Sequence, residues 1–265
     1  MGRMSDRHCI VTGAGRGIGR AIAAALLKEG ANVVLADRDA AVAQTAEQVQ
    51  EQVKPGGGNR ALGLQVDVTE REQVRAMIAR AVDAFGPLHV KFNNAGINQP
   101  MKLLDVTEDN WNLIMRVNAL GVLIGIQEAA KQMIRQGSGG KIINTASIAS
   151  RQGYADIAPY CASKFAVLSL TQSAARDLAG HNITVNGFAP GVVRTPLWEQ
   201  LDRDLMALGA SKRPGQAIEE FSAGILRGRA ATPDDITGTT TFLASADSDY
   251  MTGQIVMIDG GMVLV

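Results

Sequence analysis

The chain has 265 residues, with 26 lysines and arginines against 26 aspartates and glutamates. This balanced charge excludes the basic field with which proteins collect nucleic acid or an anionic membrane surface. The length is sufficient for a buried core, and neither an internal repeat nor a change of composition divides the chain. We therefore expect a single domain over 1–265.

The same sequence gives expectations about the compartment. The longest uninterrupted apolar run, 119–126, is far shorter than the roughly 20 residues of a membrane helix. Arg3 and Arg7 stand where a secretory signal would be apolar. Two cysteines, Cys9 and Cys161, fit a reducing compartment and offer no disulfide framework. We expect a cytoplasmic protein without a membrane or nucleic-acid partner.

Apolar, β-rich runs alternate with amphipathic segments of helical length along the whole chain. Strands are predicted at 8–12, 32–36, 61–66, 88–92, 141–145, 183–188 and 254–258. Helices are predicted at 18–29, 40–53, 70–85, 108–136, 159–179 and 233–244, with a glycine-rich loop at 55–58 and a less regular region after 191. This alternation predicts an α/β fold of the Rossmann type: a doubly wound parallel sheet of about seven strands with helices on both faces.

A glycine-rich turn joins the first predicted strand to the first predicted helix. It runs from Thr12 to Gly19 as Thr-Gly-Ala-Gly-Arg-Gly-Ile-Gly. Glycines at such a place allow a tight turn and a close approach to a pyrophosphate, whose charge the helix N-terminus meets. The alternative is a purely structural turn, but its position between strand and helix favours dinucleotide binding. The predicted contacts are Gly13, Arg16, Gly17, Ile18 and Gly19.

An acidic residue, Asp37, ends the second predicted strand, eighteen positions after Gly19. A carboxylate there accepts hydrogen bonds from the adenosine ribose and repels a 2′-phosphate, which indicates NAD. Arg16 and Arg38 could instead meet a 2′-phosphate, or be solvated surface charges. We expect the hydrogen bonds and the charge repulsion of the Asp37 carboxylate to outweigh the two arginines and to favour NAD over NADP.

A tyrosine and a lysine, Tyr160 and Lys164, stand four positions apart after Pro159. On a helix they share one face. A free tyrosine has a pKa of about 10, too high for a general base near neutral pH, and a neighbouring ammonium lowers it. Ser147, thirteen positions earlier at the end of a predicted strand, can direct its hydroxyl at the same substrate oxygen. An isolated pair of this kind is weak evidence, so the rest of the chain must support it.

Taken together, these motifs resemble the short-chain dehydrogenase/reductase family. The shared residues, in the family's order, are Thr12-Gly13-x-x-x-Gly17-x-Gly19, Asn93-Asn94-Ala95-Gly96, Asn118, Ser147, Tyr160-x-x-x-Lys164 and Pro190-Gly191. The resemblance covers nearly the whole chain. It implies hydride transfer between a secondary alcohol and a nicotinamide cofactor, with Tyr160 as general acid or base.

The resemblance also implies roles for individual residues. The catalytic tetrad would be Asn118, Ser147, Tyr160 and Lys164, in which Lys164 also binds the nicotinamide ribose and Asn118 helps to hold a water. Without the family, Asn118 reads as a helix kink or a polar core contact. Further cofactor contacts would be Asp67 and Val68 at the adenine, Asn93, Ala95 and Gly96 behind the adenosine, and Pro190, Gly191, Val193 and Thr195 around the nicotinamide. Asn94 would stabilise the sheet instead. No metal is expected, because the three histidines are scattered and show no zinc-site spacing.

The substrate pocket is expected from the segments after Ser147 and Gly96 and from a region within 196–228. That region carries apolar residues at helical spacing, which predicts either a mobile lid or an ordinary core-facing helix. The expected pocket residues are Ser147, Ala149, Gln152, Tyr154, Tyr160 and Trp198. Two stretches, 183–198 and 248–254 with the tail 259–262, resemble the 2,3-butanediol dehydrogenase/acetoin reductase group, and polyol dehydrogenases such as sorbitol dehydrogenase share much of them.

The predicted substrate is therefore a small vicinal diol or a sugar alcohol, and the choice between a four-carbon diol and a six-carbon polyol stays open. Alternatives are a 3-oxoacyl reductase or hydroxysteroid dehydrogenase, and a non-catalytic NAD-sensing protein. Such sensors usually lose the tyrosine or the lysine, and both are present here. Family members pair through the helices predicted at 108–136 and 159–179 and through the last strand, so we expect a homotetramer. The apolar tail 262–265 fits burial at such a contact.

Overall fold

A computed structural model describes residues 2–53 and 58–264, so Met1, Val265 and most of the predicted loop at 55–58 lie outside the described residues. Seven strands form one sheet in the order β3-β2-β1-β4-β5-β6-β7. Every neighbouring pair is parallel. The strands are β1 (His8–Thr12), β2 (Asn32–Asp37), β3 (Ala61–Gln65), β4 (Val90–Asn93), β5 (Gly140–Thr145), β6 (Ile183–Pro190) and β7 (Ile255–Ile258). The predicted single-domain, doubly wound α/β fold is confirmed.

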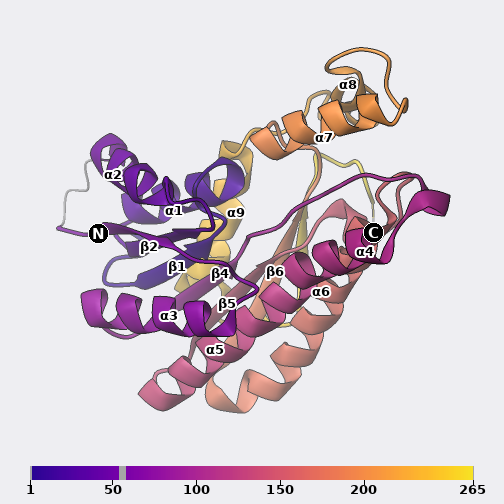
Figure 1. Ribbon diagram of the computed structural model, residues 1–265. Coiled ribbons are helices and arrows are strands. Elements are labelled where there is room, and N and C mark those ends of the chain that lie inside the picture. Colours follow the sequence, from indigo (N-terminus) through magenta and orange to yellow (C-terminus); the bar gives the residue numbers. More distant parts are fainter. Residues whose placement is uncertain (1, 54–57, 265) are drawn as a thin grey trace.

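Helices cover both faces of this sheet (Figure 1). One face packs against α1 (Gly17–Lys28), α2 (Val42–Val53) and α9 (Asp234–Ala244), and the other against α3 (Arg71–Phe85), α5 (Gly121–Gln136) and α6 (Ala158–Leu178). Successive strand residues point to opposite faces. In β1, Ile10 therefore joins the core on the α3–α5–α6 side, while Cys9 and Val11 join the other. The strands read as continuous apolar runs because both of their faces are buried.

The helix predicted at 108–136 is not uniform. It consists of α4 (Glu108–Met115), a π-helical segment Arg116–Leu120, and α5. Such wide turns are frequent at functional sites, and Asn118 lies inside this one. By length and composition Glu108–Gln136 could cross a membrane, but 61% of its most apolar window is buried inside the protein. Burial in the core accounts for that composition.

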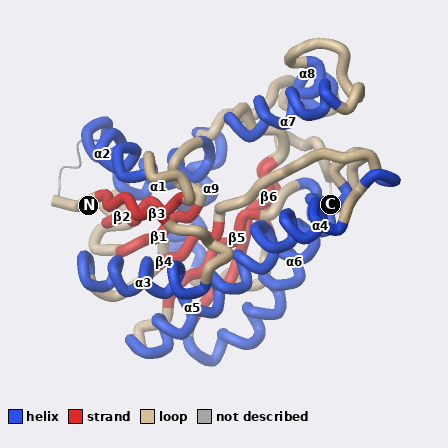
Figure 2. The backbone as a smooth tube through the Cα atoms, in the orientation of Figure 1, coloured by secondary structure: helices blue, strands red, loops and turns tan. Residues whose placement is uncertain are grey.

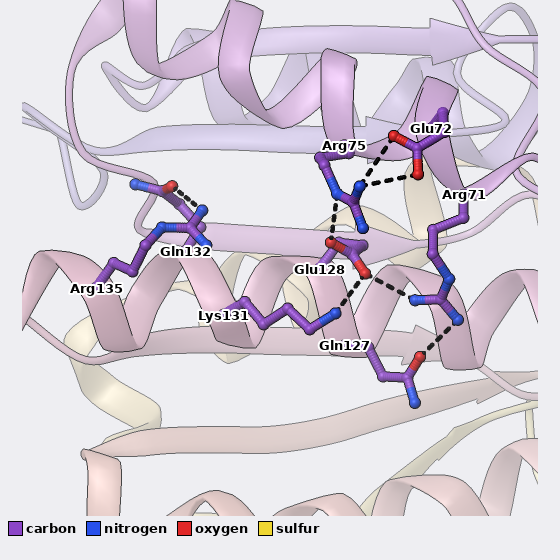
Figure 3. A network of polar contacts seen from close by, with 8 residues as sticks. All are labelled: Arg71, Glu72, Arg75, Gln127, Glu128, Lys131, Gln132 and Arg135. Carbon is purple, nitrogen blue, oxygen red and sulfur yellow. Dashed lines mark hydrogen bonds and ion pairs between the residues drawn. The ribbon is translucent and has the colours of Figure 1, made fainter.

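An ionic cluster joins α3 to α5 (Figure 3). The carboxylate of Glu128 on α5, only 4% exposed, accepts hydrogen bonds from Arg71, Arg75 and Lys131 at 2.7, 3.3 and 2.8 Å. Burial alone would raise the pKa of Glu128, but these three cations lower it to about 2. The cluster therefore fixes α3 against the helix that carries the π-helical segment at its start.

After β6 the chain leaves the sheet as two further helices, α7 (Pro196–Ala207) and α8 (Gln216–Ser222). The predicted less regular region thus contains helices, and it projects from the body of the protein on loops that return toward the sheet (Figures 1 and 2). Thr195 starts α7, because its side chain accepts the Trp198 N–H and Pro196 fits the first turn. A parallel bridge between Val193 and Ala231 closes the base of the excursion.

Candidate active site

The carboxyl ends of the central strands open into one cleft of about 280 Å³. It lies where the strand order reverses between β1 and β4, the place at which open α/β sheets bind ligands. Its lining includes these predicted cofactor contacts: Gly13, Arg16, Gly17, Ile18, Gly19, Asp37, Asp67, Val68, Ala95, Gly96, Tyr160, Lys164, Pro190, Gly191, Val193 and Thr195. The structure thus brings together residues from position 13 to position 195 of the chain.

The glycine turn leaves no room for a side chain at Gly13 or Gly19. Gly13 and Gly17 have φ of 64° and 56°, a region that favours glycine. A Cβ on Gly19 would lie 2.2 Å from the Gly13 carbonyl oxygen, and one on Gly13 would lie 2.7 Å from the Ala95 Cα. Within the described residues, no side chain caps the N-terminus of α1 and its first turn carries no acid. The free N–H groups and the helix dipole therefore suit a pyrophosphate.

The end of β2 presents a fixed carboxylate. Asp37 Oδ2 accepts the Gly15 N–H at 2.9 Å, and Oδ1 accepts the Asp39 N–H at 3.1 Å. Arg16 and Arg38 join Asp37 around an adjoining hollow of about 340 Å³. The acidic residue and both arginines singled out in the sequence therefore meet at one end of the cleft.

One predicted cofactor contact, Asn93, does not line the cleft. Its side chain is buried in the sheet, where Oδ1 accepts a hydrogen bond from Lys91 Nζ and Nδ2 donates to Asn144 Oδ1, both at 2.9 Å. Asn94 lines the cleft instead, and its Nδ2 holds the glycine turn through the carbonyls of Thr12 and Gly13. The cause is strand geometry, since neighbouring residues point in opposite directions.

The four residues of the expected catalytic tetrad come from three elements. Ser147 follows β5, Tyr160 and Lys164 lie in the first turns of α6, and Asn118 lies in the π-helical segment. Lys164 Nζ is 5.6 Å from the centre of the Tyr160 ring and donates to the Thr145 carbonyl at 2.8 Å. The predicted sharing of one helix face by tyrosine and lysine is therefore present.

Asn118 is fully buried and joins two parts of this site. Its amide exchanges hydrogen bonds with the backbone of Ile97, each at 2.9 Å, and donates to Ser163 Oγ on α6 at 3.0 Å. A Cβ on Gly96 would lie 3.3 Å from Asn118 Oδ1 and 3.7 Å from Lys164 Nζ. Gly96 therefore allows the loop after β4 to pass close to both side chains.

Burial dominates the protonation behaviour of the pair. It raises the pKa of Tyr160, and a hydrogen bond with the Ser147 side chain lowers that pKa by less. Burial also lowers the pKa of Lys164 to about 8. The sequence predicts that Lys164 lowers the pKa of Tyr160. In the protein without bound cofactor or substrate this prediction is wrong, because the pKa of Tyr160 is raised. Loss of solvation outweighs the attraction of an ammonium that is itself desolvated.

A second cavity, of about 370 Å³, adjoins the cleft, and we name it the outer cavity. Ser147 and Tyr160 line both spaces. Of the remaining expected pocket residues, Ala149, Tyr154 and Trp198 line the outer cavity. Gln152 does not: it is exposed and donates to the Tyr154 hydroxyl at 2.8 Å from outside.

Two helices that project from the sheet form the far wall of the outer cavity. Leu201 and Leu205 of α7 and Ala217 of α8 pack in one apolar cluster with Ala149 and Cys161. The apolar stripe of 196–228 thus faces the outer cavity, and Cys161 packs as expected for a core residue.

Sequence reasoning missed Phe221 on α8. Its ring lies 5.4 Å from that of Trp198, edge to face, and 5.9 Å from that of Tyr154. The spacing of Ala217 and Phe221, one helical turn apart, was the available signal. Over residues 2–53 and 58–264, no group of three or more His, Cys, Asp or Glu side chains is placed to hold a metal ion.

Known proteins resemble this chain over almost its whole length. A family model described as enoyl-(acyl carrier protein) reductase matches residues 13–263. The (S)-acetoin-forming diacetyl reductase of Staphylococcus epidermidis is 40% identical over 97% of this chain and 99% of its own. The L-2,3-butanediol dehydrogenase of Corynebacterium glutamicum is 41% identical over 97% and 99%. The galactitol 2-dehydrogenase of Agrobacterium fabrum is 39% identical over 98% of each.

Solved structures agree with these relatives. A short-chain type dehydrogenase/reductase from Mycobacterium marinum superposes with a TM-score of 0.87 at 36% identity, covering 99% of this chain and 97% of that one. A protein from Beutenbergia cavernae, described as an NAD(P)-dependent gluconate 5-dehydrogenase with bound NADP at low occupancy, superposes with a TM-score of 0.85 at 33% identity, covering 98% and 99%. The chain belongs to the short-chain dehydrogenase/reductase family. It is an oxidoreductase of secondary alcohols, in a family that uses NAD or NADP.

Proposed function

We propose that the protein uses NAD to interconvert small vicinal diols, hydroxy ketones and diketones, with Tyr160 as general acid and base. The observation that carries this proposal is the position of Tyr160, which lines both the cleft and the outer cavity. A substrate in the outer cavity would thus present its oxygen to the phenol and its carbon to the cleft. The names of the relatives, diacetyl reductase and L-2,3-butanediol dehydrogenase, support this substrate class.

The cleft fits a nicotinamide dinucleotide, which when bound supplies or accepts the hydride. The uncapped N-terminus of α1 would hold the pyrophosphate, and Asp37 would accept the ribose hydroxyls, favouring NAD. Arg16 and Arg38 are the groups that would meet the 2′-phosphate of NADP. Dissociation constants for NADH and NADPH, measured by fluorescence, test the preference. Tighter binding of NADPH would contradict it.

Three side chains carry the proton chemistry in this proposal. Ser147 Oγ accepts the Ala149 N–H at 3.1 Å and its side chain hydrogen-bonds with Tyr160, so the serine hydroxyl would bind the substrate oxygen beside the phenol. Tyr160, whose pKa burial raises, is protonated at neutral pH and can donate to a ketone. Lys164, with a pKa of about 8, is mainly cationic at neutral pH and stabilises the phenolate that results. Oxidation needs that phenolate at the start, so we expect alcohol oxidation to accelerate as pH rises.

For Asn118 we propose a positioning role. Its hydrogen bonds to Ile97 and Ser163 tie the loop after β4 to α6, and so set the distance between the cleft and Tyr160. The water-holding role implied by the family resemblance is part of the same proposal.

The Tyr160→Phe variant tests the mechanism. We expect turnover to fall by more than about a hundredfold, because general acid–base catalysis contributes factors of this size. NADH binding should persist, which separates loss of chemistry from loss of fold. A variant that kept wild-type turnover would exclude Tyr160 as the proton donor.

The galactitol 2-dehydrogenase relative supports a second candidate, oxidation of a six-carbon polyol. Rates of NAD reduction with meso-2,3-butanediol and with sorbitol decide between the two. Inactivity with both would contradict the proposed substrate class and direct attention to 3-oxoacyl or steroid ketones.

We propose a cytoplasmic homotetramer. Apolar side chains remain 41–44% exposed along α4, α6 and the segment between α4 and the end of α5, namely Trp111, Leu113, Leu120, Ile134 and Phe165. A second exposed group, Leu226 and Leu264, lies near the C-terminal end of the chain. Apolar groups of this kind mark subunit contacts. Sedimentation at the 28.0 kDa of one chain would contradict the assembly.

A further inference from the structure

The outer cavity is larger than a four-carbon substrate requires. An apolar cavity of about 150 Å³ holds a benzene molecule. The outer cavity measures about 370 Å³, more than twice that volume. Diacetyl and 2,3-butanediol have the same number of non-hydrogen atoms as benzene, so either would leave more than half of the space to be filled by water.

The walls of that surplus space are apolar. Ile157, Leu201, Leu205 and Ala217 line it and pack in one buried cluster, and Phe221 adds an aromatic face. Water held there would have few hydrogen-bond partners, and an apolar group that displaced it would gain affinity.

The outer cavity also contains a few polar side chains, Ser211, Asp156 and Glu220, and the two carboxylates each already accept a hydrogen bond. Asp156 accepts from Lys102 Nζ at 2.9 Å, and Glu220 accepts from Gln216 Nε2 at 2.7 Å. Most of the additional hydroxyls of a hexitol would lie against the apolar wall of Leu201, Leu205 and Ala217, which offers no hydrogen bonds. Each hydroxyl buried without a partner weakens binding by about ten- to a hundredfold. The far part of the cavity therefore disfavours a polyol chain.

One polar side chain without a hydrogen-bond partner for its oxygen among the described residues lies at the end of the outer cavity that adjoins the cleft. Asn98 lines the outer cavity directly after Ile97, which lines the cleft, and its buried Oδ1 lacks a hydrogen-bond partner in the described part of the chain. The Oδ1 of Asn98 can therefore accept a hydrogen bond from a hydroxyl of the substrate. Two neighbouring oxygens followed by an apolar group match this order of polar and apolar walls.

We propose that the preferred substrates are vicinal diketones and hydroxy ketones that carry an apolar group of about the size of a phenyl ring, with that group held by α7 and α8. This inference rests on the proposed function and specifies its substrate. In the reduction of 1-phenyl-1,2-propanedione, one carbonyl carbon gains a hydride from NADH and its oxygen gains a proton from Tyr160. The C=O π bond is lost, and the products are a hydroxy ketone and NAD⁺.

The experiment compares kcat/KM for 1-phenyl-1,2-propanedione and diacetyl with NADH. Burial of a phenyl ring predicts a ratio of about 10 to 100 in favour of the aryl diketone for the wild-type protein. The Ala217→Leu variant fills the far wall, and we expect this ratio to fall at least tenfold. Ala223→Leu, on an exposed residue just after α8, is the matched control and should leave both rates unchanged.

Each result has one meaning. A wild-type ratio at or below one, with diacetyl reduced efficiently, overturns this inference and leaves the proposed function standing. A high ratio that Ala217→Leu does not change also overturns it, because the ring would then bind elsewhere. If neither diketone is reduced although NADH binds, the proposed function itself fails.

Discussion

Lys91 is a lysine in the middle of the sheet, and its replacement should make the protein more stable. The side chain lies on β4 between Ile10 and Ile142 and is 0% exposed. Its Nζ donates to the Phe92 carbonyl at 3.0 Å and to Asn93 Oδ1 at 2.9 Å. Burial lowers the pKa of Lys91 from 10.5 to about 7, so a charged ammonium is strongly disfavoured there.

The size of the effect follows from that pKa. Each pKa unit corresponds to about 1.4 kcal/mol, so burying this amine lowers the free energy of unfolding at pH 7 by about 4 kcal/mol. Lys91→Met removes this cost and keeps an unbranched apolar stem. It also leaves Asn93 Oδ1 without its donor, which costs about 1–3 kcal/mol, whereas the Phe92 carbonyl keeps the Thr12 hydroxyl. We expect a net gain of about 1–3 kcal/mol at pH 7.

The pH dependence distinguishes this account from a general packing effect. Between about pH 7 and 10.5 the unfolded chain holds a proton at Lys91 that the folded chain lacks, so wild-type stability rises with pH in this window. The advantage of Lys91→Met should shrink by about 1.4 kcal/mol per pH unit and disappear between about pH 8 and 10. Urea unfolding at fixed protein concentration measures it, with the exposed Lys28→Met as control. A variant less stable than wild type at pH 7, by an amount independent of pH, would refute the reasoning.

Three further predictions concern other parts of the molecule. Glu128→Gln should lower the free energy of unfolding by about 1.5–3 kcal/mol at pH 7. This is less than the loss expected on breaking a fully buried ion pair, because the cations around Glu128 are partly exposed. Urea titrations should show the loss diminishing as the pH falls from 4.5 toward 2. Burial lowers the pKa of His89 to about 4, so the folded protein loses stability as pH falls from 6.5 toward 4. The His89→Asn variant retains an acceptor for the His8 N–H and should unfold at a lower pH in an acid titration followed by circular dichroism. An unchanged midpoint of acid unfolding would exclude this role for His89. Gly19→Ala should abolish NADH binding measured by fluorescence, since its Cβ would meet the Gly13 oxygen at 2.2 Å, whereas Gly180→Ala, with open space around its Cβ, should bind normally.

The sequence was sufficient for the order of elements, because apolar periodicity records which faces are buried. Boundaries shifted by one or two residues, as with β4, predicted at 88–92 and found at Val90–Asn93. The π-helical segment was not predictable, since it accompanies contacts of Asn118 with Ile97 and Ser163 that only the folded chain creates. Periodicity also could not foresee α8, which is short and follows Gly215 in a left-handed conformation.

The candidate site was predictable where the motif itself supplies the geometry, as with Tyr160 and Lys164 on one helix face. The site was not predictable where a shift of one residue along a strand decides which side chain faces the cleft. Asn94 faces it, whereas the side chain of Asn93 is buried in the sheet. Phe221 lies far from the motifs in sequence and reaches Tyr154 only through tertiary packing. The pKa of Tyr160 depends on burial, which a list of neighbouring charges does not contain.

The bridge between Val193 and Ala231 gives the excursion between them a narrow base. Arg194 N–H donates to the Ala231 carbonyl at 2.8 Å, and Ala231 N–H donates to the Val192 carbonyl at 2.9 Å. The two ends of the segment 194–230 thus lie next to each other, so the segment can be replaced as a unit without moving the strands of the sheet. Replacing this segment with that of a relative should therefore change the substrate preference while Ser147, Tyr160 and Lys164 stay in place.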